Sequence, residues 1–146
     1  MTWNEDFAKG FIGLRGNPQA IGEVYQIMSD ESLTWDQIYQ CVADALGFEY
    51  KPYYVSSDYL AAIAPRAYDL RGALLGDKAV TVRFDCSKLK RAVPGFCATT
   101  HLGQGVRKAL SYIMEHPEVQ REDPEFDAWC DKVIETLETT KGSFGC

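Results

Sequence analysis

The sequence predicts a mixed α/β domain, in which helices flank a small sheet of about three strands. Apolar residues alternate with a period of two in three short stretches, and they recur every three or four residues in several longer ones. Glycines and prolines separate these stretches. With 146 residues, 46% of them hydrophobic, the chain has the size and composition of one globular domain. We expect that domain at residues 1–140, followed by a flexible tail at 141–146.

Charge and cysteine content exclude several classes of protein. The net charge of −6 gives no basic surface for nucleic acid, and no stretch approaches the 18 apolar residues of a membrane span. The N-terminus lacks the pattern of a signal peptide. Five cysteines, without C-x-x-C or zinc-ligand spacing, indicate free thiols in a reducing compartment. We therefore expect a cytoplasmic protein that binds no nucleic acid, membrane or metal.

The N-terminal segment predicts a helix from Trp3 to Leu14, which Gly16-Asn17-Pro18 ends. Phe7 and Phe11 share an apolar stripe with Leu14. Gly10 and Gly13 lie inside this helix, where each costs about 1 kcal/mol relative to alanine, so they indicate that another backbone packs closely there.

Residues 22–47 predict a strand, a turn and a capped helix. Alternation over Glu23–Met28 is typical of a short strand. Thr34 and Gln37 have the spacing of a capping box, which places the helix start next to Thr34. Gly47 stands where a left-handed residue ends a helix.

Two further strands are predicted, at Tyr50–Val55 and at Ala79–Phe84, the second with Val80, Val82 and Phe84 toward the core. A short helix, Asp58–Ala64, separates them, with either Ser56 or Ser57 as its capping residue. Four tyrosines surround the earlier strand: Tyr50, Tyr53, Tyr54 and Tyr59. They suit either a stacking platform for a sugar or base, or half-buried rings with exposed hydroxyls.

The rest of the chain predicts three helices. A short one, Cys86–Val93, follows the capping residue Asp85, and a longer one begins after Thr100 and ends at His116-Pro117. The last begins with Asp123 as N-cap and Pro124 in the first turn.

Four segments resemble one known family when they are read in order. They are Asp6-Phe7-Ala8-Lys9-Gly10, Gly22–Gly47, Phe84–Arg91 (a D-x-S-K-x-x-R pattern) and Gly105-Val106-Arg107. Together they are similar to the C-terminal substrate-binding lobe of the NAD-dependent epimerase/dehydratase family, the extended short-chain dehydrogenases. From the residues alone, Asp6 is most simply a first-turn carboxylate near the helix dipole.

The resemblance implies a lobe that closes over NAD or NADP held by an N-terminal Rossmann half. The chain has no glycine-rich turn between a strand and a helix, and none of its tyrosines has a lysine four residues later. We therefore assign no catalytic or cofactor-binding residue, and expect the chain to begin downstream of both motifs. The resemblance implies substrate contact at Arg83, Lys88 and Arg91, which in the family border the nucleotide-sugar phosphates.

One departure leaves the substrate open. The family's R-x-G-D phosphate clamp is replaced by Leu74-Leu75-Gly76-Asp77, which lacks the arginine fork. The expected function is thus the substrate-binding lobe of a sugar-nucleotide epimerase/dehydratase-like oxidoreductase, inactive by itself. The alternative is a free-standing interaction or small-molecule-binding module. The expected partner, besides a small-molecule substrate, is either the missing Rossmann half or a second copy of the chain that covers Phe7 and Phe11.

Overall fold

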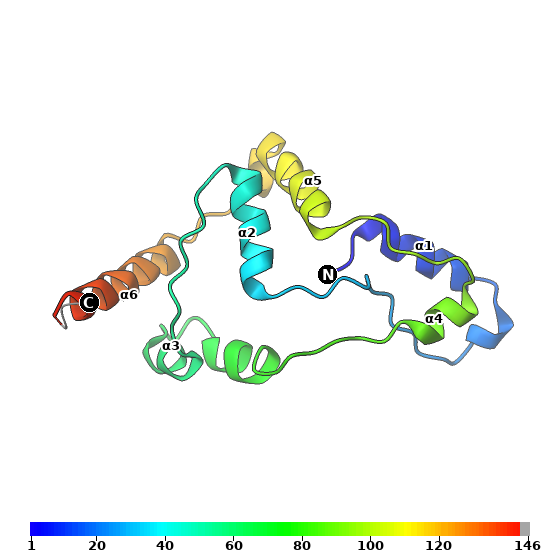
Figure 1. Ribbon diagram of the computed structural model, residues 1–146, viewed down its shortest axis with the longest axis horizontal. Helices are drawn as coiled ribbons and strands as arrows, with labels where there is room; N and C mark the ends of the chain where they lie inside the picture. The colour runs from blue at the N-terminus through cyan, green and yellow to red at the C-terminus, as the bar shows by residue number, and fades with distance from the viewer. Residues whose placement is uncertain (144–146) are drawn as a thin grey trace. The chain divides into compact units, whose positions relative to one another are not determined.

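The computed structural model describes residues 1–143, apart from the side chain of Asp77, and they form helices joined by extended segments (Figure 1). Helix accounts for 58% of the chain, and the described residues contain no strand. The helices are α1 (Asn4–Leu14), α2 (Trp35–Leu46), α3 (Ser57–Ile63), α4 (Ser87–Ala92), α5 (Leu102–Glu115) and α6 (Pro124–Ser143). Three shorter turns of helix are η1 (Pro18–Ala20), η2 (Gly72–Asp77) and η3 (Pro117–Val119). No helix in this part of the chain has the length and apolar character needed to cross a membrane.

The predicted α/β class with a three-stranded sheet is wrong, because the described part of the chain is helical and has no sheet. Residues 23–28 keep the expected alternation, with Ile27 buried and Val24 exposed, but they pair with no other segment. Val80 and Phe84, expected in the core, are 68% and 53% exposed. A period of two specifies which side chains share a side of an extended backbone. It does not supply the distant hydrogen-bonding partner that a strand requires.

Several helix ends follow the sequence closely, although the N-cap of α4 is Cys86 rather than the predicted Asp85. In α2, Thr34 Oγ1 accepts a hydrogen bond from the Gln37 N–H at 3.2 Å, and Gln37 Oε1 accepts one from the Thr34 N–H at 2.8 Å. Gly47 ends this helix with φ of 74°. The predicted capping box and left-handed terminus are therefore confirmed.

The predicted starts of the third and last helices are also confirmed. Ser56 Oγ accepts from the Tyr59 N–H at 3.3 Å, and Asp123 Oδ1 accepts from the Phe126 N–H at 3.1 Å. Helix α6 continues to Ser143, three residues into the expected tail. The rest of that tail, 144–146, lies outside the described residues.

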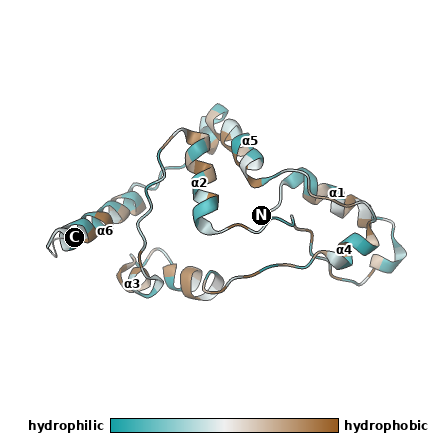
Figure 2. Ribbon diagram, viewed as in Figure 1, coloured by the Kyte–Doolittle hydropathy of each residue, from teal (hydrophilic) through white to brown (hydrophobic). Residues whose placement is uncertain are grey.

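The chain divides into two compact units. The first unit comprises Met1–Tyr50 and Val82–His116, and the second comprises Lys51–Thr81 and Pro117–Cys146. In the first unit, α2 packs against α5. Figure 2 shows both hydrophobic and hydrophilic residues along α2.

The core of the first unit is formed where α1, α4 and the segment that contains Ile27 pack together. Ile27, Leu89 and Phe96 are buried there, and Leu14, Tyr25 and Val93 pack around them. A Cβ atom added at Gly10 would lie 2.7 Å from Ile27 Cγ2 and 3.0 Å from the Phe96 ring. The expected close approach at Gly10 is present, but side chains make it rather than another backbone.

Helix α1 is buried through its small and polar face. Asp6 and Gly10 are its buried residues, and Gly13 meets Val93 on the same face. Phe7 and Phe11, on the apolar stripe identified in the sequence, are 47% and 59% exposed. The helix therefore directs its largest apolar side chains away from the core of its own unit.

The second unit is organised by aromatic rings. The ring of Phe126 lies between those of Tyr68 and Trp129, with centroid distances of 4.9 and 5.5 Å. Trp129 Nε1 donates to the Ile63 carbonyl at 3.2 Å, which ties α6 to α3. The Tyr68 hydroxyl donates to Asp123 Oδ1 at 2.6 Å, and this hydrogen bond is the main reason why the pKa of Tyr68 is raised to about 12.

Candidate functional site

A buried carboxylate anchors the start of α1. Asp6 is fully buried and accepts hydrogen bonds from Lys9 Nζ at 2.7 Å, Thr99 Oγ1 at 3.3 Å and the Thr100 N–H at 2.9 Å. The hydrogen bond from Lys9 is the largest cause of a pKa well below the ordinary range, and it outweighs desolvation, which acts in the opposite direction. Asp6 lies in the first turn of α1, as the sequence predicted, and its carboxylate also joins this helix to residues 99–100.

Lys88, predicted to contact substrate, is held by an ion pair. Its Nζ lies 2.5 Å from Glu23 Oε2 and 4.8 Å from the centre of the Tyr25 ring. The hydrogen bond from Lys88 lowers the pKa of Glu23. Lys88 thus fastens α4 to the extended segment 23–28, and an incoming anion would compete with Glu23.

Of the three predicted substrate-binding residues, Lys88 and Arg91 stand three positions apart on α4, whereas Arg83 precedes this helix. Arg83 lies in an extended segment and Arg91 in the last turn of α4, and both are exposed. Within the described residues, no hydrogen bond or ion pair joins either of them to Lys88. The charge of Arg91 contributes to a lowered pKa at Asp85, although the main cause there is the hydrogen bonds from Ser87.

Sequence reasoning missed a second ion pair on α4. Lys90 Nζ lies 2.7 Å from Asp30 Oδ2, and this hydrogen bond raises the pKa of Lys90. The Lys88 and Lys90 pairs hold the two ends of the segment that runs from Glu23 to Asp30. Lys90 and Asp30 are 60 residues apart, so no local sequence pattern indicates that they pair.

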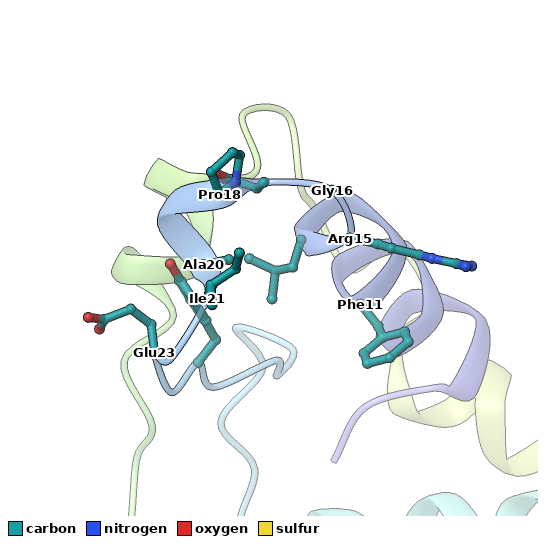
Figure 3. A pocket seen from close by; sticks show the side chains of 10 residues that line it. Phe11, Arg15, Gly16, Pro18, Ala20, Ile21 and Glu23 are labelled. Atoms are coloured by element: carbon teal, nitrogen blue, oxygen red, sulfur yellow. The ribbon is translucent and has the colours of Figure 1, made fainter.

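Exposed aromatic residues and an adjoining hollow form an apolar feature on α1. The Phe7 and Phe11 rings lie nearly parallel, with centroids 6.2 Å apart. Phe11 also lines a hollow of about 380 Å³ between α1 and η1, together with Leu14, Pro18, Ala20, Ile21 and Tyr25. In Figure 3 the side chain of Arg15 extends away from Pro18 and Ile21, so the hollow is bordered by charge but lined by apolar groups. We call Phe7, Phe11 and this hollow the α1 surface.

The four tyrosines, for which a stacking platform was one of two alternatives, are divided between the units. Tyr50, in the first unit, donates from its hydroxyl to Asp36 Oδ1 at 2.9 Å. Tyr53, Tyr54 and Tyr59 belong to the second unit, and each is more than 40% exposed. Glu138 raises the pKa of Tyr53, mainly through its charge.

The histidines occupy helix ends. His101 precedes α5, and its Nδ1 lies 3.0 Å from Glu31 Oε1, while Glu31 Oε2 accepts from the Leu102 N–H at 2.8 Å. His116 follows α5, with Nδ1 2.7 Å from the Tyr112 carbonyl oxygen. These placements agree with helix-end roles. In the part of the chain that the structure covers, no three His, Cys, Asp or Glu side chains form a metal-binding group.

Comparison with known proteins adds no relative. No family model matches the chain, and no curated protein or solved structure matches it either.

Proposed function

We propose that this chain is the substrate-binding lobe of an NAD(P)-dependent oxidoreductase similar to the sugar-nucleotide epimerases and dehydratases. It acts in the cytoplasm, and it works only when a dinucleotide-binding half is docked on it. The cofactor belongs to that half, and the lobe supplies contacts to a small-molecule substrate.

The observation that carries this proposal is the meeting of the family-like segments in one unit. Gly10 packs on Ile27 and Leu89, so the first three segments share one core. In the fourth segment, a Cβ atom at Gly105 would lie 3.1 Å from the Trp3 ring, so α5 packs closely on the N-terminal residues. The resemblance rests on the order of the four segments along the chain. In the folded chain these segments are also neighbours in space.

The α1 surface supplies a docking face. A soluble monomer seldom leaves a large apolar patch uncovered, whereas an interface within a chain commonly covers about 600 to 1,500 Å². Phe7, Phe11 and the hollow are open on the first unit, and Ile12 beside them is 66% exposed. Docking of the dinucleotide-binding half would remove these side chains from water.

Substrate contact is proposed at Lys88, Arg83 and Arg91. These residues differ in whether an existing ion pair must break before they can bind an anion. Lys88 must leave Glu23 to reach a phosphate, whereas Arg83 and Arg91 are exposed and reach one without that exchange. Residues 74–77 lie in the η2 turn and offer no guanidinium group. The diphosphate of a nucleotide sugar thus has no arginine fork at this position, and a different small hydroxyl or carbonyl compound is the alternative substrate.

The test begins with the DNA directly upstream of the Met1 codon and the neighbouring genes. We expect one of them to encode a strand, a G-x-G-x-x-G turn and a helix. Its product, co-expressed with this chain, should purify with it in equal amounts. If no such segment is encoded there, the proposal is contradicted.

A matched pair of variants tests the docking face. Phe7→Ser with Phe11→Ser should reduce co-purification at least tenfold, since this change removes the apolar side chains that docking covers. Tyr112→Ser with Met114→Ser replaces two residues that are 55% and 67% exposed on α5, and it should leave co-purification unchanged. Equal effects of the two pairs would place the interface elsewhere.

The α1 surface also favours a second candidate, a free-standing interaction module. The hollow beside Phe11 has the volume of a site for one or two apolar side chains, and such a module would need no dinucleotide-binding half. The upstream DNA distinguishes the two candidates, because only the lobe requires a Rossmann segment.

A further inference from the structure

In the segment Val24–Met28, the backbone groups of residues 24–27 have no hydrogen-bonding partner in the described chain, whereas the Met28 carbonyl accepts a weak hydrogen bond from Cys86 Sγ at 3.6 Å. The neighbouring residues are fixed, because the Glu23 N–H donates to the Ala20 carbonyl at 3.2 Å and the Ser29 N–H donates to Thr2 Oγ1 at 2.9 Å. A row of unpaired backbone groups with both ends held is the geometry of an exposed strand edge.

The side chains hold this segment in one orientation. Ile27 is buried in the core and Tyr25 packs beside it, whereas Val24 is 78% exposed. A slip by one residue would expose Ile27 and bury Gln26, so the register is fixed by burial. The edge therefore offers a defined surface for pairing.

The segment lacks the charged residues and prolines that usually prevent a strand edge from pairing with another chain. Residues 24–28 include no charged residue and no proline. At its ends, the carboxylates of Glu23 and Asp30 are paired with Lys88 and Lys90. Two copies can therefore approach at this edge without opposing unpaired charges, although the chain as a whole carries a net charge of −6.

We propose that a second copy of the chain pairs with this edge, as two antiparallel strands related by a two-fold axis at Gln26. In that register Val24 lies opposite Met28 of the other copy, Tyr25 opposite Ile27, and the two Gln26 residues face each other. This dimer does not rest on the proposed function, because it uses backbone groups of residues 24–28 rather than the α1 surface. Since five-residue strands bury little area, we expect half of the chains to be paired at about 100 µM.

Cysteine cross-linking tests the register. Facing Gln26 residues would have Cα atoms about 5 Å apart, within the range of a disulfide. Residue 24 of one copy would lie about 13 Å from residue 24 of the other, which a disulfide does not span. In a background with Cys97→Ser and Cys146→Ser, Gln26→Cys should oxidise to a covalent dimer, whereas Val24→Cys and the background itself should not.

Charge substitution tests the edge without oxidation. Gln26→Lys places two ammonium groups opposite each other and should weaken dimerisation at least tenfold, as measured by sedimentation velocity. Gln19→Lys adds the same charge at an exposed position of η1 and should dimerise like the unaltered chain. Helix content measured by circular dichroism should be equal in the two variants, because the Gln26 backbone makes no hydrogen bond that the monomer would lose.

The proposal is overturned if the unaltered chain is monomeric at about 100 µM, or if Gln26→Lys dimerises as well as Gln19→Lys. Equal cross-linking at residues 24 and 26 would also overturn it. A dimer that Phe7→Ser with Phe11→Ser dissociates, and Gln26→Lys does not, would assign self-association to the α1 surface.

Discussion

Asp6 shows how a single side chain can determine which face of a helix is buried. Its carboxylate has three hydrogen-bond donors and no exposure, so it keeps its charge inside the unit. With Asp6 and Gly10 facing inward, Phe7 and Phe11 must face outward, because they lie on a different side of the same helix.

Replacement of Asp6 by asparagine should lower the free energy of unfolding by roughly 1.5–3 kcal/mol, the range for hydrogen bonds to a charged group. Urea denaturation followed by circular dichroism measures this change. Asp58→Asn removes an exposed carboxylate from the first turn of α3 and should cost much less. Equal losses would mean that Asp6 contributes no more than a surface charge.

The stabilisation from Asp6 should depend on pH in a defined direction. Because the folded-state pKa lies below the ordinary value of about 3.9, the contribution is complete above about pH 5 and is lost as the pH falls further. The acid unfolding curve of Asp6→Asn should therefore be flatter below pH 5 than that of the unaltered chain. Parallel curves would contradict this account.

Position 10 requires glycine because there is no room for a Cβ atom, and not because the backbone needs a conformation that only glycine adopts. Although alanine favours a helix by about 1 kcal/mol, the Cβ atom of Gly10→Ala would meet Ile27 and Phe96, and overpacking of this kind costs about 1–3 kcal/mol. We expect a net loss of stability in thermal unfolding. Gly142→Ala, where a Cβ atom meets nothing within 4 Å, should be neutral or stabilising. A stabilising Gly10→Ala would disprove the packing described for α1.

At the scale of elements, sequence predicted the local structure well and the non-local structure poorly. Helix ends depend on residues three or four positions apart, so Thr34 with Gln37 and Ser56 with Tyr59 were readable. Pairing of residues 23–28 with another strand depends on a partner that the described chain does not provide. The inward placement of Asp6 depends on Thr99 and Thr100, more than 90 residues away. For the candidate site, substrate contact at Arg83, Lys88 and Arg91 stays a prediction. The sequence predicted neither the ion pair of Lys88 with Glu23 nor that of Lys90 with Asp30.

The capping box makes a testable contribution to α2. Thr34→Ala should cost about 1 kcal/mol of unfolding free energy, because the Gln37 N–H loses its acceptor. Thr34→Ser keeps the hydroxyl and should retain most of that stability. The comparison is a pair of urea titrations, and equal stability of the two variants would show that the cap contributes nothing measurable.

At the scale of the whole molecule, the two units differ in what they offer a partner. The first contains the family-like segments, the α1 surface and the free backbone edge, whereas the second is held by the rings around Phe126. Both proposals of partnership therefore involve the first unit.

The five cysteines are spread along the whole chain, so their reactivity can be used to test the burial of thiols in both units. Cys41, Cys86, Cys97 and Cys130 are free, and Cys146 lies outside the described residues. We expect five thiols to be alkylated in unreduced, unfolded protein. In native protein Cys146 should react first, followed by Cys97, which is exposed. Burial raises the pKa of Cys130, so the Cys130 thiol should react more slowly. Intact-mass and peptide analysis would reveal a native disulfide as a loss of two hydrogens, which would contradict this expectation.

The central claim is that this chain supplies a substrate lobe and that a docked partner supplies the cofactor site. Calorimetric titration of NADH and NADPH tests it most directly, first into the chain alone and then into its co-purified complex. We expect no binding to the chain alone and saturable binding to the complex. A dissociation constant tighter than about 100 µM for the chain alone, or about 5.5 kcal/mol of affinity, would contradict the claim.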